Sequence, residues 1–408
     1  MEQKRIMILG VGEAQLNLIA EAKKLGYYIV ICDMRAESEG AKLADSFYAV
    51  NYMDRDAILE AAKKEHIDGV ISNSEAAMLN VAWLSEQLHL PGNPEESIDI
   101  LLSKSRFRDL QRKAGVYAPE HFVSDSADEI VAFAKTMRYP VIVKPSESSG
   151  TRGTTRIDAF DESAIRKAFA ECQEWSRENQ VAIEEYVVMS SLRVNDIELF
   201  VQDGEILWDG WFWQDRAEDA PMLPRTEIYP MGLADTEREK IRDTVEKIMR
   251  AAKIRHGEYN AETYFTPEGE VFVIEINPRQ AGNHIPQLVE EHTGINLTKL
   301  LVSTAVGDLS YYNELKAYPR QCNYITMQIV FSKQTGVFRE LYIDPEIKPF
   351  VKWIIQEAKP GDKVVKGRNA AEAVAFVDLQ FDSYETQHRF TDDIEKYIRA
   401  VTDETAEH

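Results

Sequence analysis

The first quarter of the chain alternates short apolar runs with amphipathic stretches of helical length. The apolar runs are RIMILGVG, YYIVICDM and IDGVISN, and segments such as AQLNLIAEAKKLG separate them. Short apolar strands joined by helices favour parallel pairing with right-handed crossovers. The pattern therefore predicts a small doubly wound α/β domain over about residues 1–95.

The rest of the chain predicts three further units of mixed α+β character. Residues 96–187 hold a helix over SIDILLSKSRFRDLQRKAG, the strand PVIVKP with a glycine-bearing loop, and the strand VAIEEYV. Residues 188–317 begin with a hairpin whose turn is the strong signal Asp203-Gly204, and continue through the helix TEREKIRDTVEKIMRAAK to the strands EYNAETYFTPEGEVFVIEIN. Residues 318–408 are predicted to form a small C-terminal lobe that ends in a helix over DDIEKYIRAVTDE.

Composition and charge narrow the class of protein. The chain carries 69 acidic and 47 basic residues, a net charge of −22. Such a surface repels polyanions, which argues against a nucleic-acid or acidic-membrane partner. Cys32, Cys172 and Cys322 lack metal-ligand spacing and are expected to be reduced. No signal-peptide pattern opens the chain and no apolar stretch approaches the ~20 residues that cross a bilayer, so a cytoplasmic location is expected.

The segment PVIVKPSESSGTRGTTRI suits phosphate binding. An apolar strand delivers Lys144 and then turns into a small-residue loop containing Gly150 and Gly153, where backbone amides could approach phosphate oxygens closely. Lysine is a compact point charge that suits this task. The alternative for this segment alone, at equal weight, is a surface hairpin with an exposed lysine.

The segment EYNAETYFTPEGEVFVIEINPRQAGNH predicts a magnesium site. Glu262 and Glu275 lie on two apolar strands joined by the turn TPEGE, and antiparallel pairing would bring their carboxylates together, with Asn277 on the same face. Such hard oxygen ligands suit magnesium that bridges substrate phosphates. Arg279 continues this face and could stabilise charge on a phosphoryl group or an oxyanion. An ordinary hairpin with outward charges is less favoured, because Glu275 and Asn277 interrupt an apolar strand.

Taken in order, these features resemble the ATP-grasp superfamily, and the resemblance covers nearly the whole chain. The family order is a small α/β domain, a lysine on an early helix, a strand lysine before a glycine-rich lid, an acidic hinge strand and a final E-x-N-x-R. Here these features are Lys104 in LLSKSRFRDL, Lys144 in VIVKP, the loop from Ser146 to Gly153, the hinge AIEEYV, and EINPR. The resemblance implies an ATP-grasp fold behind an N-terminal pre-ATP-grasp domain.

The resemblance also implies roles for particular residues. The ATP phosphates would be bound by Lys104, Lys144, Ser148, Ser149, Gly150 and Thr151, and adenine by the hinge residues Glu184, Glu185, Tyr186 and Val187. Magnesium, or manganese in its place, would be bound by Glu262, Glu275 and Asn277, with Arg279 and Lys144 as catalytic residues. Family members usually carry a ribose-binding acid about seven residues after the hinge glutamate. Here the sequence is VVMSSLRVNDIELF, so either Glu198 or Asp196 takes this role or the contact is missing.

Within the superfamily, NPRQAGNHIPQLVEEHTGINL and KGRNAAEAVAFVDLQF look like the amino-acid ligases that join two unprotected amino acids. Together with Arg279, the residues Gly282, Asn283 and His284 would hold the carboxylate substrate, although His284 could equally be a packing residue. Glu75 either binds a substrate ammonium or caps the following helix, as Ser74 could. The implied activity is an ADP-forming carbon–nitrogen ligase that passes an acyl phosphate to an amine, with small molecules as partners and a homodimer compatible with this interpretation.

Three other functions share parts of this pattern. A purine-pathway enzyme would need a basic pocket for a ribose phosphate, which the acidic composition does not indicate. A biotin-dependent carboxylase would need a lysine-bearing biotin domain, and a catalytically silent nucleotide-binding subunit would not need the complete set of charged site residues. The run WDGWFWQD adds Trp208, Trp211 and Trp213, which are predicted to cover a sheet face, with an apolar substrate pocket as the alternative.

Overall fold

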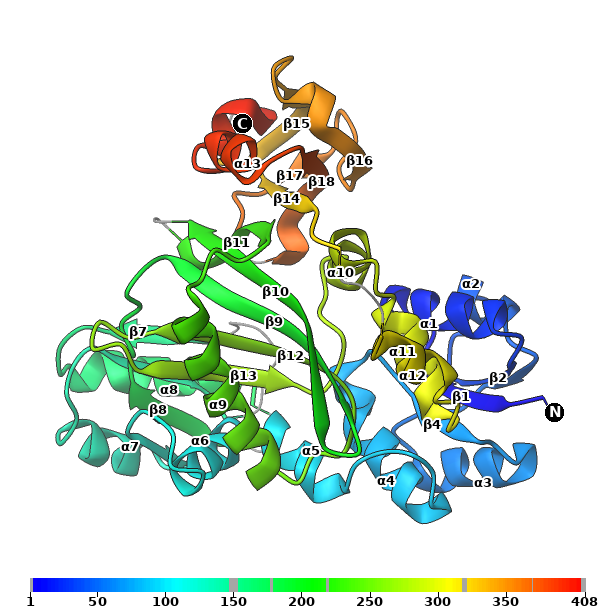
Figure 1. Cartoon of the computed structure of the whole chain (residues 1–408). Helices are drawn as coiled ribbons and strands as arrows, with labels where there is room; N and C mark the ends of the chain where they lie inside the picture. The colour runs from blue at the N-terminus through cyan, green and yellow to red at the C-terminus, as the bar shows by residue number, and fades with distance from the viewer. Residues whose placement is uncertain are drawn as a thin grey trace.

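The fold is taken from a computed structural model of the whole chain, which describes residues 3–146, 153–176, 179–217, 220–317, 321–368 and 370–404. An N-terminal α/β domain lies beside a central body, and the C-terminal strands lie above that body in the view of Figure 1. No helix in the described ranges is both long and apolar enough to span a membrane.

The N-terminal domain is a four-stranded parallel sheet in the order β3-β2-β1-β4. Its elements are β1 (Arg5–Leu9), α1 (Glu13–Lys24), β2 (Tyr28–Cys32), α2 (Glu39–Lys42), β3 (Ser46–Tyr48), α3 (Arg55–Glu65), β4 (Gly69–Ile71), the short helix η1 (Glu75–Ala77) and α4 (Met78–Leu88). β1 and β2 are buried along all but their first residues, as expected for parallel strands covered on both faces. The predicted doubly wound domain is confirmed.

A second, four-stranded sheet has the order β5-β8-β6-β7. Its elements, with the helices before it, are α5 (Glu95–Leu102), α6 (Lys104–Lys113), β5 (His121–Ser124), α7 (Ala127–Ala134), β6 (Val141–Pro145), β7 (Thr155–Ile157), α8 (Glu162–Gln173) and β8 (Val181–Glu185). The single helix predicted over 97–115 was wrong. Ser103 adopts extended backbone, with φ −95° and ψ 114°, and this break places Lys104 at the start of α6.

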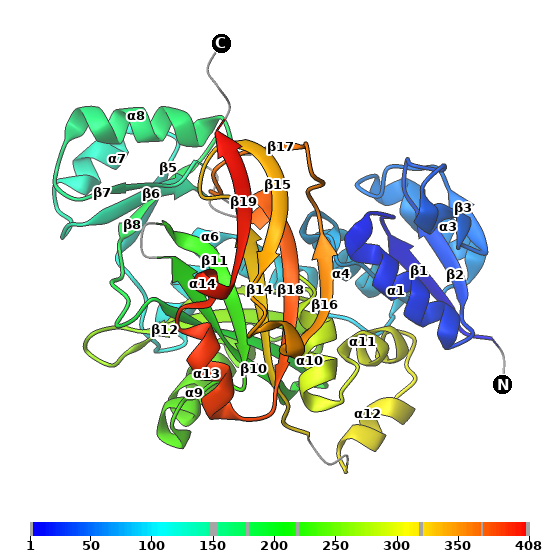
Figure 2. The same ribbon diagram turned by 90° about the horizontal axis from the view of Figure 1, so that it is seen from above.

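The largest sheet has eight antiparallel strands in the order β13-β12-β9-β10-β11-β14-β18-β16. Its strands β14, β18 and β16 lie side by side in Figure 2. Its first five strands and the neighbouring helices are β9 (Arg193–Gln202), β10 (Glu205–Ala217), β11 (Ala220–Tyr229), α9 (Asp235–Ala251), β12 (His256–Phe265), β13 (Val271–Asn277), α10 (Ile285–Thr293), α11 (Leu297–Ala305) and α12 (Ser310–Leu315). The hairpin turn at Asp203-Gly204 is confirmed, with positive φ at both residues.

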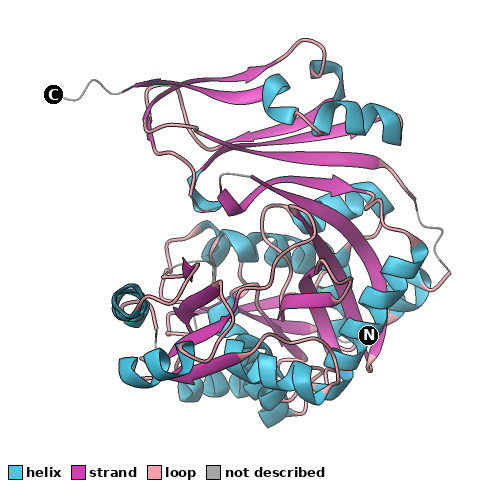
Figure 3. Ribbon diagram, turned by 90° about the vertical axis from the view of Figure 1, so that its left-hand side faces the viewer, coloured by secondary structure: helices cyan, strands magenta, loops and turns pink. Residues whose placement is uncertain are grey.

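The residues after 318 extend this sheet and add a small second one. The elements are β14 (Tyr324–Phe331), β15 (Gly336–Ile343), η2 (Lys348–Phe350), β16 (Val351–Gln356), β17 (Lys363–Val364), η3 (Ala370–Glu372), β18 (Ala373–Phe381), α13 (Tyr384–Thr391), α14 (Ile394–Tyr397) and β19 (Ile398–Glu404). β14 pairs with β11, so hydrogen bonds cross the predicted boundary at residue 318. Figure 3 shows the strand that leads to the C-terminus beside other long strands at one end of the molecule.

The helix predicted over 392–404 was wrong for most of its length. α14 ends at Tyr397, and the following residues form β19, which pairs with β15 from Ile343↔Ile398 onward. Ile398 is fully buried in the C-terminal core. Pairing and burial therefore override the local helical pattern.

Two aromatic residues of β10 cover the face of the large sheet that α9 packs against. A register shift between Leu207 and Gly210 turns Trp208 and Trp211 to the same side, where their ring centroids lie 5.4 Å apart. The α9 residue Arg242 lies over both rings. The sheet-face interpretation of the tryptophans is supported, and these two rings take no part in the candidate site.

The N-terminal domain docks on α11 through a close backbone approach at the start of β4. A Cβ atom on Gly69 would lie 2.1 Å from the carbonyl oxygen of Ala305, so only glycine fits this contact. The contact fixes β4, and with it the residues that follow β4, against the central body.

We expect Gly69→Ala to lower the free energy of unfolding by about 1–3 kcal/mol, because the added methyl group forces β4 and α11 apart. Urea unfolding followed by tryptophan fluorescence measures the change. Gly282→Ala is the matched control, since its Cβ meets nothing within 4 Å, and it should change stability by less than about 0.5 kcal/mol. Equal stabilities for the two variants would contradict the close approach at Gly69.

Candidate nucleotide and metal site

A buried ion network joins the two sheets at the predicted nucleotide cleft. The β8 carboxylate of Glu184 contacts Lys144 of β6 on one side and accepts a hydrogen bond from Arg108 Nε of α6 at 3.2 Å on the other. All three side chains are at least nine-tenths buried. Arg108 also donates to the carbonyl oxygens of Val273 and Ile274 in β13, at 3.2 and 3.0 Å.

The electrostatics of this network follow from burial. Burial raises the pKa of Glu184, but Lys144 and Arg108 outweigh it and hold that pKa at about 2. Burial lowers the pKa of Lys144 to about 8, although the facing carboxylate opposes the shift. The pair is therefore ionised at neutral pH. Both oxygens of the Glu184 carboxylate contact these two cations. The adenine contact predicted for the hinge would therefore have to come from Glu185, Tyr186 or Val187.

An apolar cluster lies between the hinge and the large sheet. Tyr264 and Phe272 meet edge to face, with ring centroids 5.2 Å apart, and the Tyr264 hydroxyl donates to the carbonyl oxygen of the hinge residue Val187 at 2.7 Å. Ile274 and Met189 pack against the same cluster. An apolar surface beside the hinge backbone suits a purine ring. The hinge residues Glu185 and Tyr186 lie next to it, with Arg156 over the Tyr186 ring at 4.4 Å.

The predicted pairing of the two acidic strands is confirmed. Glu262 of β12 lies directly opposite Glu275 of β13, and Asn260 lies opposite Asn277. A register shift after Glu262 leaves Ile274 as an extra residue in β13. Val271, Val273 and Ile276 pack toward α9, whereas Phe272 and Ile274 pack toward the hinge. The bulge thus brings the apolar cluster and the acidic pair onto one face.

The donor set at this pair fits a magnesium ion. Asn277 Nδ2 donates to Glu275 Oε1 at 2.9 Å, and Arg216 Nη2 of β10 lies 3.1 Å from Glu262 Oε2. Burial raises the pKa of Glu262, whereas Lys104, Asn277 and Arg279 outweigh burial at Glu275 and lower its pKa. Within the described ranges no three His, Cys, Asp or Glu side chains gather into a metal cage. Two carboxylates and an amide oxygen instead suit magnesium that completes its shell with phosphate and water.

The phosphate-binding residues fall partly inside the described ranges. Lys104 lies where α6 begins, and its backbone nitrogen approaches the carbonyl oxygen of Ser146 at the end of β6. This contact places Lys104 beside the start of the predicted lid and within the field of Glu275. The lid residues Ser148, Ser149, Gly150 and Thr151 lie outside the described residues.

Glu198 and Asp196, the candidates for the ribose contact, lie deep in the sheet rather than beside the hinge. Asn260 Nδ2 donates to both, at 2.7 Å to Glu198 Oε1, and Glu198 has no exposed surface. Gly210 lies opposite Glu198, where a Cβ would meet the glutamate Cβ at 2.6 Å. Burial, with Glu258 close by, raises the pKa of Glu198 well above its ordinary value. This arrangement does not support a ribose contact by Glu198.

The predicted substrate residues gather where the N-terminal domain meets the central body. Arg279 Nη2 lies 3.7 Å from Glu75 Oε2 of η1. Within the described part of the chain Ser74 makes no side-chain cap, while Glu75 lies in the first turn of η1, so both alternatives for Glu75 stay open. A second bridge runs from Asn73 Nδ2 to Gln280 Oε1 at 2.8 Å. The fold therefore brings Glu75 of the N-terminal domain close to Arg279 of the central body.

The loop before α10 holds the remaining predicted substrate residues. Asn283 and His284 both have positive φ, 52° and 61°, which is uncommon for two successive residues other than glycine. The His284 ring packs edge-on against Trp353 and Phe376, with centroids 5.9 and 5.4 Å away. These contacts support the packing role for His284, while Gly282 is exposed.

Sequence reasoning missed several residues of this site. Arg108 lies one helical turn after Lys104, and that spacing could have indicated a second basic residue on the same side of α6. Arg216 and Gln280 carried no comparable signal. Their partners, Glu262 for Arg216 and Glu258 for Gln280, become neighbours only through cross-strand and loop packing.

We expect Glu184→Ala to destabilise the protein by about 3–5 kcal/mol, because it leaves Lys144 and Arg108 buried without a counter-charge. Guanidinium unfolding at pH 7 measures this loss. The folded pKa of Glu184 lies below its ordinary 4.5, so the stabilisation is present above about pH 4.5 and is lost as the pH falls toward 2. Asp109→Ala removes an exposed carboxylate of α6, the helix that carries Arg108, and should cost no more than about 1 kcal/mol. A loss of unfolding free energy in Glu184→Ala that is no larger than in Asp109→Ala would contradict the buried network.

Known protein families match both parts of this site. The ATP-grasp N-terminal domain matches residues 19–92, and the ATP-grasp domain matches residues 137–287. An uncharacterized protein, y4rH, of Sinorhizobium fredii is 26% identical over 324 residues, which cover 77% of this chain and 64% of that protein. The carbamoyl phosphate synthase large chain of Clostridium acetobutylicum is 25% identical over 370 residues, which cover 85% of this chain and 33% of that protein. The chain thus spans less than two thirds of the length of these relatives.

A solved structure shares the fold over the whole chain. The L-amino acid ligase from Bacillus licheniformis superposes with a TM-score of 0.81 at 20% identity, covering 99% of this chain and 100% of that chain. The two family matches fall on the N-terminal parallel domain and on the sheets that hold the lysine, hinge and acidic pair. The chain belongs to the ATP-grasp superfamily.

Proposed function

We propose that this protein is an ATP-dependent ligase that activates the carboxylate of an amino acid as an acyl phosphate and transfers the acyl group to an amine. The observation that carries the proposal is the pairing of Glu262 with Glu275 on one sheet face, between the apolar cluster at the hinge and Arg279. That order matches the order of an ATP molecule and its acceptor: adenine, phosphates with magnesium, and then the substrate carboxylate.

The residues of the site have distinct tasks in this reaction. Lys104 and Lys144 bind phosphate oxygens. Glu262, Glu275 and Asn277 would hold a magnesium ion, which would supply positive charge beside the transferring phosphoryl group. A substrate carboxylate oxygen forms a bond to the γ-phosphorus as the bond to the β-phosphate oxygen breaks, and ADP leaves. Arg279 stabilises the negative charge on the substrate. The amine nitrogen then bonds to the carbonyl carbon of the acyl phosphate. The bond from that carbon to the bridging oxygen breaks, inorganic phosphate leaves with this oxygen, and the nitrogen loses a proton.

The pairing of Glu75 with Arg279 supports an α-amino acid as the carboxylate substrate. An α-amino acid carries a carboxylate and an ammonium group only two bonds from each other through its α-carbon. Arg279 and Glu75 offer a cation and an anion whose charged atoms lie 3.7 Å apart, which is the complementary arrangement. The shared fold with an L-amino acid ligase supports the same substrate class.

We expect Glu275→Gln and Arg279→Ala each to lower amine-dependent ADP release by at least about 100-fold, because each removes charge stabilisation that the transition state needs. A coupled ADP assay across amino-acid pairs, with hydroxylamine added to trap the acyl phosphate, measures the loss. Glu270→Gln, an exposed carboxylate on the same hairpin, is the matched control and should keep normal turnover. Normal turnover in either site variant would overturn the site assignment.

We expect Glu75→Gln to weaken recognition of the substrate ammonium group. KM for alanine should rise about tenfold or more, while KM for propionate, which lacks the ammonium group, should stay within about twofold. Glu60→Gln, which neutralises an exposed glutamate of α3 in the same domain, should leave both values unchanged. An equal rise for alanine and propionate would show that Glu75 serves only to hold Arg279.

A further inference from the structure

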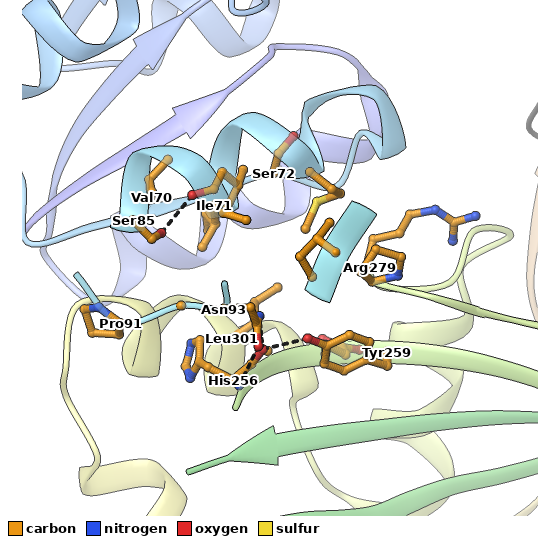
Figure 4. Close-up of a pocket in the computed structure, with 18 residues that line it drawn as sticks. Val70, Ile71, Ser72, Ser85, Pro91, Asn93, His256, Tyr259, Arg279 and Leu301 are labelled. Carbon is orange, nitrogen blue, oxygen red and sulfur yellow. Dashed lines mark hydrogen bonds between the residues drawn. The ribbon is translucent and has the colours of Figure 1, made fainter. Parts of the chain in front are cut away.

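A cavity of about 50 Å³ lies between the N-terminal domain and the large sheet. Its walls come from β4, α4, the linker residues 91–93 and the first residues of β12. Arg279 lies at one end of the cavity, and Pro91 and His256 lie at the other (Figure 4). The cavity therefore starts at the residue that is proposed to bind the substrate carboxylate.

The wall is apolar over most of its surface. The hydrocarbon part is contributed by Ile71, Met78, Val81, Ala82, Ile98 and Leu301. Several polar groups of the wall are bonded within the protein: the Ser85 hydroxyl donates to the Val81 carbonyl at 2.8 Å, and Asn93 Nδ2 and the Tyr259 hydroxyl donate to the His256 carbonyl at 2.6 and 2.9 Å. Water needs two to four polar partners, so most of this wall favours hydrocarbon over water.

The size of the cavity limits what it can hold. One water requires roughly 10–15 Å³ of such volume, so the cavity takes roughly three to five groups of that size. The branched side chains of valine and leucine have three and four carbon atoms. A glycine would leave the cavity empty, and an aromatic ring would overfill it.

The cavity lies on the side of Arg279 that is away from the metal face. Each strand residue adds roughly 3.3 Å, so Glu258, which lines the cavity, lies roughly 13 Å along β12 from Glu262. Arg279 follows two residues after Asn277 and touches both regions. A carboxylate bound at Arg279 can thus present its oxygens to the metal face while its α-substituent points into the cavity.

We propose that this cavity is the side-chain pocket for the carboxylate substrate, and that this substrate is an α-amino acid with a short branched aliphatic side chain. The inference rests on the proposed function, because Arg279 and Glu75 are the groups that would hold the carboxylate and the ammonium. The pocket adds the third point of contact that distinguishes one amino acid from another.

One polar atom of the wall favours a competing occupant. His256 Nε2 has no hydrogen-bond partner among the described residues, whereas the Glu258 carboxyl is bonded to Gln280 and to the Glu198 carboxyl. Burial lowers the pKa of His256 to about 4, so the ring is neutral at pH 7. Nδ1 lies 3.1 Å from the acceptor Gln202 Oε1 and carries the proton, which leaves Nε2 able to accept a hydrogen bond. A side chain with a terminal donor would satisfy it. Threonine and valine have the same shape, so comparing them separates the two occupants.

The test measures ADP release and hydroxamate formation by the full-length enzyme with glycine, alanine, valine, leucine, threonine and phenylalanine. We expect kcat/KM for valine or leucine to exceed that for glycine, threonine and phenylalanine by at least about tenfold. Threonine at or above valine would overturn the aliphatic pocket. If no amino acid supports ADP release, the proposed function fails and the pocket fails with it.

Variants of α4 test the location of the pocket. Ala82→Leu fills the cavity and should raise KM for leucine about tenfold or more while leaving alanine within about twofold; Ala82→Val is the milder change if the larger side chain disturbs folding. Met78→Ala enlarges the cavity and should shift the preference toward phenylalanine. Leu79→Ala changes the adjacent residue of α4, which does not line the cavity, and should leave the order of preference unchanged. Amino-acid-dependent ADP release with an unaltered preference in both cavity variants would overturn the pocket and leave the proposed function standing.

Discussion

The site depends on the buried contact of one carboxylate with two cations, Glu184 with Lys144 and Arg108. Three segments that are far apart in the chain meet there: α6, the strand pair β6 and β8, and the bulged strand β13. Burying any one of these charges alone would cost several kcal/mol of desolvation free energy. Burial of all three together costs less, because the carboxylate and the two cations attract each other. The network therefore fixes the distance between the small sheet and the large sheet, and the apolar cluster at the hinge lies between them.

The same network explains why the metal face has its particular order. Arg108 donates to the carbonyl groups at the bulge of β13, and the bulge changes which side chains face the cleft. Without the extra residue, Ile274 and Glu275 would point to opposite faces, because strand side chains alternate. With it, an apolar surface and a pair of carboxylates follow each other along one face. The β-bulge at Ile274 thus places the apolar surface proposed for adenine next to the carboxylates proposed for the metal and phosphates.

The parts of the structure that could be predicted from sequence are those whose cause is local. The parallel N-terminal sheet follows from short apolar runs between helices, and the acidic hairpin follows from the turn TPEGE between two apolar strands. The break at Ser103 and the strand after Tyr397 were missed, because each coincides with a contact to distant residues: the Lys104 backbone nitrogen bonds to Ser146, and β19 pairs with β15. Arg108 was missed for the same reason, since its partners Glu184 and Val273 are 76 and 165 residues away. The roles carried over from the family resemblance remain proposals.

The continuity of the large sheet has a consequence for how the protein can be divided. β14, β18 and β16 continue the hydrogen-bonded ladder from β11, although they come after the acidic hairpin in sequence. A fragment that ended at residue 317 would keep every proposed nucleotide and metal contact, but it would leave β11 as an open edge. Open edges recruit strands from other molecules, so such a fragment would tend to aggregate. The smallest piece that behaves as an independent molecule is therefore set by strand pairing and is longer than the piece that contains the chemistry.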